Sequence, residues 1–291
     1  MTIQHTDPGT SSATGPGTDP GTDRTEFIRH WEEWHAQHEQ NLADPHGFLA
    51  VTSLRWLDGE PTRFPDAPGA WSSADDGVTV QLDENEELTV QDAVVRGRYH
   101  FGVIEERASL LATAGDAVIE VAKRGGHDIL RPRHPDNKLL VDYTHTPAYA
   151  PDPRWALTGR YLPFDAPRAV TVGAAVEGLQ HVYDAPGQVE FALEGHTYRL
   201  TAFNGTQPDS LLVLFTDATS GVTTYAANRC VSISPPDGQG TVVIDFNRAT
   251  NLPCAFTDLA TCPLPPTENR LPVAVEAGEK IPYERGGSPQ E

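Results

Sequence analysis

From Gly59 onward the chain consists of short alternating segments separated by glycine, proline, aspartate and asparagine. Alternation with a period of two residues is typical of a β-strand with one buried face, and the separating residues favour turns. The segments that we expect to be strands are residues 78–82, 87–90, 99–103, 117–122, 138–141, 156–161, 169–172, 189–193, 196–203, 211–215, 230–233 and 241–246. So many short strands with turn-length gaps predict a mainly β fold, an antiparallel sandwich or barrel.

Turn residues support this fold class. Glu194 and Gly195 separate two alternating runs, and Gly125 and Gly126 occupy a comparable place, where a tight hairpin needs positive φ angles. No segment between the strands is long and periodic enough to supply regular crossover helices. A doubly wound α/β sheet is therefore not expected.

The N-terminal region has a different composition. Residues 1–22 consist largely of Thr, Gly, Pro, Ser and Asp, so ordering them would bury almost nothing, and we expect a disordered tail. Asp23 followed by Glu26 resembles a helix N-cap with its reciprocal partner. The apolar residues that follow recur at helical spacing, at Phe27, Trp31, Trp34 and Leu42. They predict an amphipathic helix that ends near Ala43 and packs onto the sheet through an apolar cluster in residues 48–57.

The C-terminal region is rich in proline, which cannot donate ladder hydrogen bonds. We expect residues 251–280 to form an ordered, irregular wrap over the sheet, in which only residues 271–275 alternate enough to rejoin as a strand. Residues 281–291 are expected to be frayed. The predicted organisation is one β-rich domain over residues 23–280.

Charge restricts the partners. The chain has 41 acidic and 21 basic residues, and its formal net charge is −20. Such a charge repels phosphate backbones and anionic lipid, so neither nucleic acid nor a membrane surface is an expected partner. A cationic partner would be attracted, although acidity also simply keeps a chain in solution. The sequence leaves the oligomeric state open.

Cysteine usage and hydropathy indicate the compartment. Three cysteines occur in a long chain that has no charged and apolar leader at its start, a pattern typical of a cytoplasmic protein. The longest apolar runs, such as residues 211–215, are much shorter than the roughly 20 residues needed to cross a bilayer. No transmembrane helix is expected.

Familiar chemical motifs are absent from the sequence. It has no Gly-rich phosphate loop, no Gly-x-Ser-x-Gly elbow and no Cys-x-x-Cys pair, so it indicates no cofactor. His35 and His38 would share a helical face, but metalloprotease histidines are four residues apart with a glutamate between them. We interpret that face as solvated and opposite the tryptophans. His127, His134 and His145 lie in a polar region that we expect to be a loop, and no metal site is predicted.

Residues 215–229 place acid, hydroxyl and arginine groups after an apolar strand. Clustered polar groups at strand ends often line binding sites. The alternative is a hairpin in which Asp217 and Thr219 cap the turn through their side chains, with Gly221 in the left-handed conformation.

A second informative region begins at Ile244. Residues 244–256 read Ile-Asp-Phe-Asn-Arg-Ala-Thr-Asn-Leu-Pro-Cys-Ala-Phe, and residues 261–272 read Thr-Cys-Pro-Leu-Pro-Pro-Thr-Glu-Asn-Arg-Leu-Pro. With Glu-Ala-Gly-Glu-Lys at residues 276–280, this string resembles the C-terminal hallmark of the prokaryotic family called domain of unknown function 1684. The resemblance includes earlier positions, at Asp217, Gly221, Thr224, Tyr225, Arg229 and residues 47–49, 55–57 and 153–155. It implies an architecture and a set of positions, but no reaction.

The polar residues of these two regions have two possible roles, ligand binding and structural support. Arg229 and Arg248 would each clamp a carboxylate bidentately, either on a ligand or on an acid of the chain itself. Asn247, Asn251 and Asn269 would line a site or satisfy backbone groups of the proline-rich wrap. Cys254 and Cys262, eight residues apart, fit a buried pair of thiols better than a disulfide or a metal clip.

Our leading hypothesis is a small-molecule enzyme with carboxylate acid–base chemistry, performing hydrolysis, elimination or cyclisation on an anionic ligand. The expected catalytic residues are Asp217 and Asp245. The expected ligand-binding residues are Thr224, Tyr225, Arg229, Asn247, Arg248, Asn251, Asn269 and Glu279. The alternative is a non-catalytic ligand-binding or scaffold protein in which the same residues are structural.

Overall fold

The computed structural model describes residues 20–285, and these fall into two compact units. Unit 1 contains residues 41–143, and unit 2 contains residues 20–40 with residues 144–285. The expectation of a single domain over residues 23–280 stays a prediction, and the expected tail lies outside the described residues as far as position 19.

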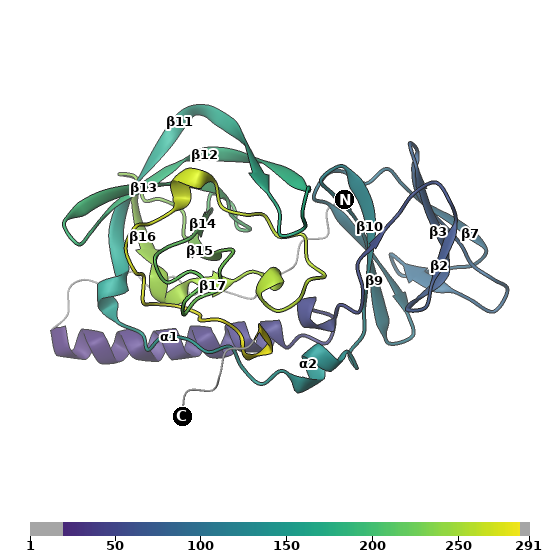
Figure 1. Ribbon diagram of the computed structural model, residues 1–291, viewed down its shortest axis with the longest axis horizontal. Coiled ribbons are helices and arrows are strands. Elements are labelled where there is room, and N and C mark those ends of the chain that lie inside the picture. Colours follow the sequence, from purple (N-terminus) through teal and green to yellow (C-terminus); the bar gives the residue numbers. More distant parts are fainter. Residues whose placement is uncertain (1–19, 286–291) are drawn as a thin grey trace. The chain divides into compact units, whose positions relative to one another are not determined.

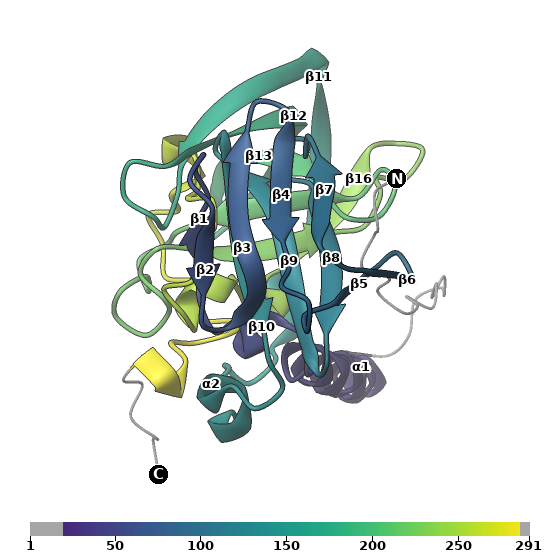
Figure 2. The same cartoon turned by 90° about the vertical axis from the view of Figure 1, so that its right-hand side faces the viewer.

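Unit 1 contains two antiparallel sheets, seen in Figure 2. The four-stranded sheet has the order β2 (Thr62–Phe64), β3 (Ala67–Ala74), β4 (Gly77–Gln81) and β7 (Arg98–Gly102). The six-stranded sheet has the order β1 (Arg55–Trp56), β10 (His127–Arg133), β9 (Ala117–Arg124), β8 (Ser109–Ala114), β5 (Leu88–Val90) and β6 (Ala93–Val95). Trp71 and Val80 of one sheet share a buried core with Ile119 and Val121 of the other. Burial of these alternating side chains holds the sheets together as a sandwich.

A buried ion cluster lies on the other face of β9 and β10. Glu120 accepts hydrogen bonds from the guanidinium groups of Arg131, Arg133 and Arg124, and Phe48 stacks on the first two of these. Burial opposes the ionisation of Glu120, but the charges of Arg131 and Arg133 outweigh it and lower its pKa to about 2. The sequence analysis did not identify this cluster.

Unit 2 is built on one seven-stranded sheet (Figure 1). Its order is β16 (Thr241–Asp245), β11 (Ala156–Gly173), β12 (Gln180–Leu193), β13 (His196–Asn204), β14 (Leu211–Phe215), β15 (Arg229–Ile233) and β17 (Thr250–Asn251). The pairing of β11 with β12 changes register between Pro163 and Arg168. Glu194 and Gly195, between β12 and β13, have φ angles of 51° and 79°. These values confirm the tight hairpin expected there.

Helix α1 (Pro20–Leu42) lies along unit 2 (Figure 1). The indole nitrogen Nε1 of Trp31 donates a 2.7 Å hydrogen bond to the carbonyl oxygen of Asn247. The helix begins at Pro20, before the predicted Asp23, because proline is tolerated in the first turn, where backbone N–H groups have no helical acceptor. The apolar cluster in residues 48–57 belongs to unit 1, and the expected packing of the helix on it stays a prediction.

Residues 253–285 form an irregular C-terminal strap, which confirms the predicted proline-rich wrap. Only short 3-10 turns interrupt it, at η4 (Pro253–Ala255), η5 (Thr267–Asn269) and η6 (Tyr283–Arg285). Val275 and Ala277 are fully buried in the core of unit 2. The predicted strand at residues 271–275 is wrong, since their backbone is not in a sheet. The expected frayed end at residues 281–291 stays a prediction. Arg285 hydrogen-bonds to Cys254 and Asp258, and residues 286–291 lie outside the described part of the chain.

Most of the predicted strands are present, so the predicted mainly β antiparallel class is confirmed, without a closed barrel. The strand predicted at residues 138–141 is wrong, because these residues lie in helix α2 (Lys138–Asp142). Residue 246 is not in a strand, because β16 ends at Asp245 and η3 (Phe246–Arg248) follows. His127 lies in β10 rather than a loop. The remaining short turns are η1 (Phe48–Ala50) and η2 (Pro153–Trp155). Among residues 20–285, no helix has the length and apolar character to span a membrane.

The Glu120 cluster generates a stability prediction. Glu120→Gln should lower the free energy of unfolding by about 3–5 kcal/mol, because it leaves buried guanidinium groups without their carboxylate. Since the folded state lowers the pKa of Glu120, its contribution is present above the unfolded value near 4.5 and is lost as the pH falls to about 2. Urea titrations at pH 7 and pH 3 would measure both effects. Glu87→Gln, at an exposed ion pair with Arg96, should change stability by less than about 1 kcal/mol.

Candidate functional site

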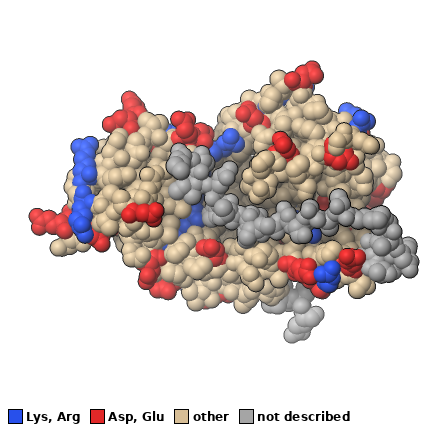
Figure 3. Space-filling view, turned by 180° about the vertical axis from the view of Figure 1, so that it is seen from behind, with Lys and Arg blue, Asp and Glu red and all other residues tan. Residues whose placement is uncertain are grey.

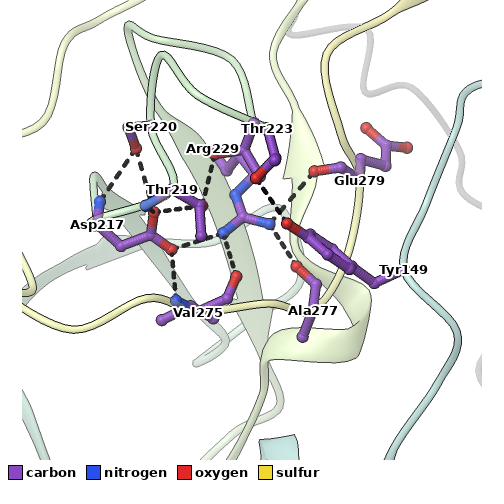
Figure 4. A network of polar contacts seen from close by, with 10 residues as sticks. Tyr149, Asp217, Thr219, Ser220, Thr223, Arg229, Val275, Ala277 and Glu279 are labelled. Carbon is purple, nitrogen blue, oxygen red and sulfur yellow. Dashed lines mark hydrogen bonds and ion pairs between the residues drawn. The ribbon is translucent and has the colours of Figure 1, made fainter.

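Arg229 is the centre of the polar network in unit 2 (Figure 4). It is the first residue of β15 and is only 1% exposed. Its Nη2 donates to Asp217 Oδ2 at 2.8 Å and to the carbonyl oxygen of Val275 at 3.0 Å. Its Nη1 donates to the carbonyl oxygens of Ala277 and Glu279. Burial lowers the pKa of Arg229, and the charge of Asp217 opposes that shift.

Asp217 lies two residues after β14 and is buried. Its Oδ1 accepts hydrogen bonds from the backbone N–H of Thr219 at 2.8 Å and from the Thr219 hydroxyl at 2.6 Å. Its Oδ2 accepts from Arg229 and from the backbone N–H of Val275. Thr224 is also buried and hydrogen-bonds through its hydroxyl to Thr219. The carboxylate therefore caps a turn and anchors the C-terminal strap, which leaves neither oxygen for a substrate.

Three asparagines hold separate backbone segments together. Asn247 accepts from the N–H of Asp152 at 2.8 Å and donates to its carbonyl at 3.0 Å. Asn269 forms the same pair of bonds with Thr201, at 2.7 Å and 2.8 Å. Asn251 donates to the carbonyl of Lys280 at 2.8 Å. All three asparagines are buried, and these bonds match the structural reading of the sequence.

Glu279 connects the C-terminal strap to α1. Its Oε1 lies 2.8 Å from Nε2 of His38, and its Oε2 accepts from the backbone N–H of Asn251 at 2.5 Å. His38 stacks on Trp34, and His35 stacks on Trp31. The interpretation of this helix face as solvated and opposite the tryptophans was wrong. The four-residue spacing of each Trp–His pair was the available signal, because such residues are neighbours on one helical face.

Asp245 and Arg248 differ from the buried network, because both reach solvent. The Arg248 side chain is 38% exposed, and its guanidinium carbon lies 5.2 Å from the centre of the Trp34 ring. Its Nε is 3.4 Å from Asp245 Oδ2 and has no hydrogen-bond partner among the described residues. Burial raises the pKa of Asp245, while hydrogen bonds from Asn247 and the charge of Arg248 oppose the rise.

Tyr225 lies apart from these groups, beside Cys254. It is half-buried, and Cys254 is among its neighbours. Burial raises the pKa of Tyr225, and the neighbouring Cys254 adds to the rise.

The ten predicted positions therefore comprise seven buried polar residues, the partly exposed pair Asp245 and Arg248, and Tyr225 beside Cys254. Within residues 20–285, no three His, Cys, Asp or Glu side chains are arranged to hold a metal ion.

Comparison with known proteins bears on the family. No curated protein matches the chain. A solution NMR structure of an uncharacterized protein from Haloarcula marismortui is similar at 28% identity, covering 48% of this chain and 78% of that chain, with a TM-score of 0.41. Residues 141–280 match the family model described as protein of unknown function (DUF1684). This match includes all ten predicted site positions. It does not include residues 47–49 and 55–57, which also carried the resemblance in the sequence. It confirms, over residues 141–280, the resemblance to this family that was found in the sequence.

Proposed function

We propose that the chain is a non-catalytic binding protein that holds a small anionic molecule at Arg248, while the buried polar residues of unit 2 are structural. The observation that carries this proposal is the difference in solvent exposure among the ten predicted positions. Seven of the ten predicted positions are buried, and the remaining three are Asp245, Arg248 and Tyr225. Among these three, only Arg248 offers a positive charge.

Arg248 has the features of an anion anchor. A planar guanidinium can donate two parallel hydrogen bonds to a carboxylate or a phosphate, and it stacks well on an aromatic ring. The ring of Trp34 supports one face of Arg248, and no hydrogen bond joins its guanidinium to another described residue. The ion pair with Asp245 holds Nε in place, so a ligand would use the two terminal nitrogens.

The net charge of −20 acts against an anionic ligand at long range. Acidic side chains are spread over the face shown in Figure 3. Such charges are screened beyond about 8 Å at physiological ionic strength, so the local geometry at Arg248 determines binding. We therefore expect weak, salt-sensitive affinity for a monoanion and stronger affinity for a dianion.

An NMR titration with acetate and with inorganic phosphate tests this site. Both anions should shift the Trp34 indole resonance and the amide resonances near Arg248, and Arg248→Gln should remove these shifts. Arg154→Gln is a matched control, because Arg154 also stacks on a tryptophan, Trp155, and pairs with an aspartate, Asp152, but is 65% exposed. The proposal fails if neither anion shifts these resonances, or if both variants weaken binding equally.

The structural role of the buried network has its own prediction. Arg229→Met and Asp217→Asn should each lower the free energy of unfolding by about 3–5 kcal/mol, because each leaves a buried charge or carbonyl group without its partner. The double variant should lower the free energy of unfolding by less than the sum of the two single decreases, since the removed groups contact each other. Chemical denaturation of the wild type, the two single variants and the double variant measures this coupling free energy. The same set of variants at the exposed pair Arg199 and Glu190 is the control. Additive losses would contradict direct coupling.

A second candidate function is an enzyme with acid–base chemistry at Asp245. It is favoured by the raised pKa of this carboxyl beside an exposed guanidinium, which would orient an anionic substrate. Carbon-13 NMR of the aspartate carboxyl groups should place the Asp245 midpoint above that of an ordinary aspartate. An activity found for the protein should be abolished by Asp245→Asn without loss of phosphate binding. A variant that retains the activity would exclude this candidate.

A further inference from the structure

Two cysteines of the C-terminal strap lie close together. Cys254 in η4 and Cys262, eight residues later, are both present as thiols. The backbone N–H of Cys254 lies 3.3 Å from Sγ of Cys262. Because an N–Cα bond is about 1.5 Å long, the Cα atom of Cys254 is at most about 4.8 Å from that sulfur. The two thiols can therefore form a bond with little movement of the backbone.

The surroundings of Cys254 favour a thiolate. Hydrogen bonding with Cys262 lowers the pKa of Cys254, burial opposes this, and Tyr225 and the charge of Arg285 lower it further. Arg285 is held next to Cys254, because its Nη2 donates to the Cys254 carbonyl oxygen at 3.1 Å and to Asp258 Oδ1 at 2.6 Å. A positive charge and hydrogen-bond donors beside a thiol are typical of reactive cysteines.

The third cysteine of the same unit provides the contrast. Burial raises the pKa of Cys230 to about 11, and its thiol is within 3.4 Å of the Thr250 hydroxyl. At neutral pH the thiolate fraction of Cys230 is therefore far below that of Cys254. Unit 2 thus contains two thiols whose surroundings shift the pKa in opposite directions.

We propose that Cys254 and Cys262 form a redox-active thiol pair that reduces small hydroperoxides, with Cys254 as the attacking thiolate and Cys262 as the resolving thiol. The size of the oxidant follows from burial. Cys254 is 2% exposed and Cys262 is 7% exposed, so a protein disulfide cannot reach them, whereas a peroxide is little larger than water. This pair is separate from the anion site at Arg248 and does not depend on it.

The chemistry proceeds in two balanced steps. The Cys254 thiolate attacks one oxygen of hydrogen peroxide, the O–O bond breaks, and the departing hydroxide takes a proton to become water. The sulfur is oxidised by two electrons to a sulfenic acid. The Cys262 sulfur then attacks the Cys254 sulfur, the S–O bond breaks, and the released hydroxide takes the Cys262 proton as a second water. A dithiol reductant such as dithiothreitol returns two electrons and two protons to the resulting disulfide.

Peroxide treatment followed by peptide mass spectrometry tests the pair. Wild-type protein should lose two of its three thiols, with a disulfide between Cys254 and Cys262 that dithiothreitol removes. Cys262→Ser should stop at a sulfenic acid on Cys254, detected as the addition of one oxygen atom to that peptide, and Cys254→Ser should form neither product. Cys230→Ser is the matched control and should behave as wild type. The proposal is overturned if wild-type protein keeps all three thiols, or if Cys230 is oxidised as fast as Cys254.

A measurement on the wild-type chain covers the case in which a cysteine variant does not fold. After brief treatment of the folded protein with hydrogen peroxide, unfolding in acid and alkylation, peptide mass spectrometry should show the Cys254 thiol lost at least about tenfold faster than the Cys230 thiol, since the rate follows the thiolate fraction. Equal rates at the two cysteines in the folded protein would refute the assignment of Cys254 as the attacking group.

Discussion

The bonds of Arg229 hold unit 2 together. A buried guanidinium is costly unless its charge is paired and its N–H groups find acceptors. Asp217 supplies the charge, and the carbonyl oxygens of Val275, Ala277 and Glu279 accept the N–H groups. The C-terminal strap in turn has backbone groups that no strand satisfies. The carbonyl groups of the strap therefore supply acceptors for the guanidinium, and the guanidinium supplies donors for those carbonyl groups. Either partner buried without the other would be destabilising.

The same requirement explains the hydrogen bonds of the polar residues that resemble an active site. An irregular segment that covers a sheet needs side-chain donors and acceptors along its length, because proline removes N–H groups and repeated strand pairing is absent. Asn247, Asn251 and Asn269 meet this need at three points, and Glu279 meets it against α1. We therefore place the proposed functions at Arg248, near the surface of this framework, and at the two thiols that the strap brings together.

Some features were predictable because they depend on local pattern. The two-residue period identified most strands, including residues 211–215 with the observed bounds, and the Trp spacing identified the helix. The strand prediction at residues 138–141 was wrong because four apolar or long side chains in a row fit a short helix as well as a strand. Residues 127–133 were missed because Asp128, Arg131 and Arg133 interrupt the apolar pattern of a strand, and their pairing with Ser73 and Glu120 is not visible in the sequence.

By itself the sequence determined the β class, the helix, the proline-rich wrap and the family resemblance, since each is encoded in neighbouring residues or a continuous motif. Only the tertiary structure decided what the polar residues do. Whether Asp217 faces a ligand or Arg229, and whether Cys254 meets Cys262, depends on distances between segments far apart in the chain or across an irregular turn. Those distances follow from how the core packs and where backbone groups find partners, which no local spacing specifies.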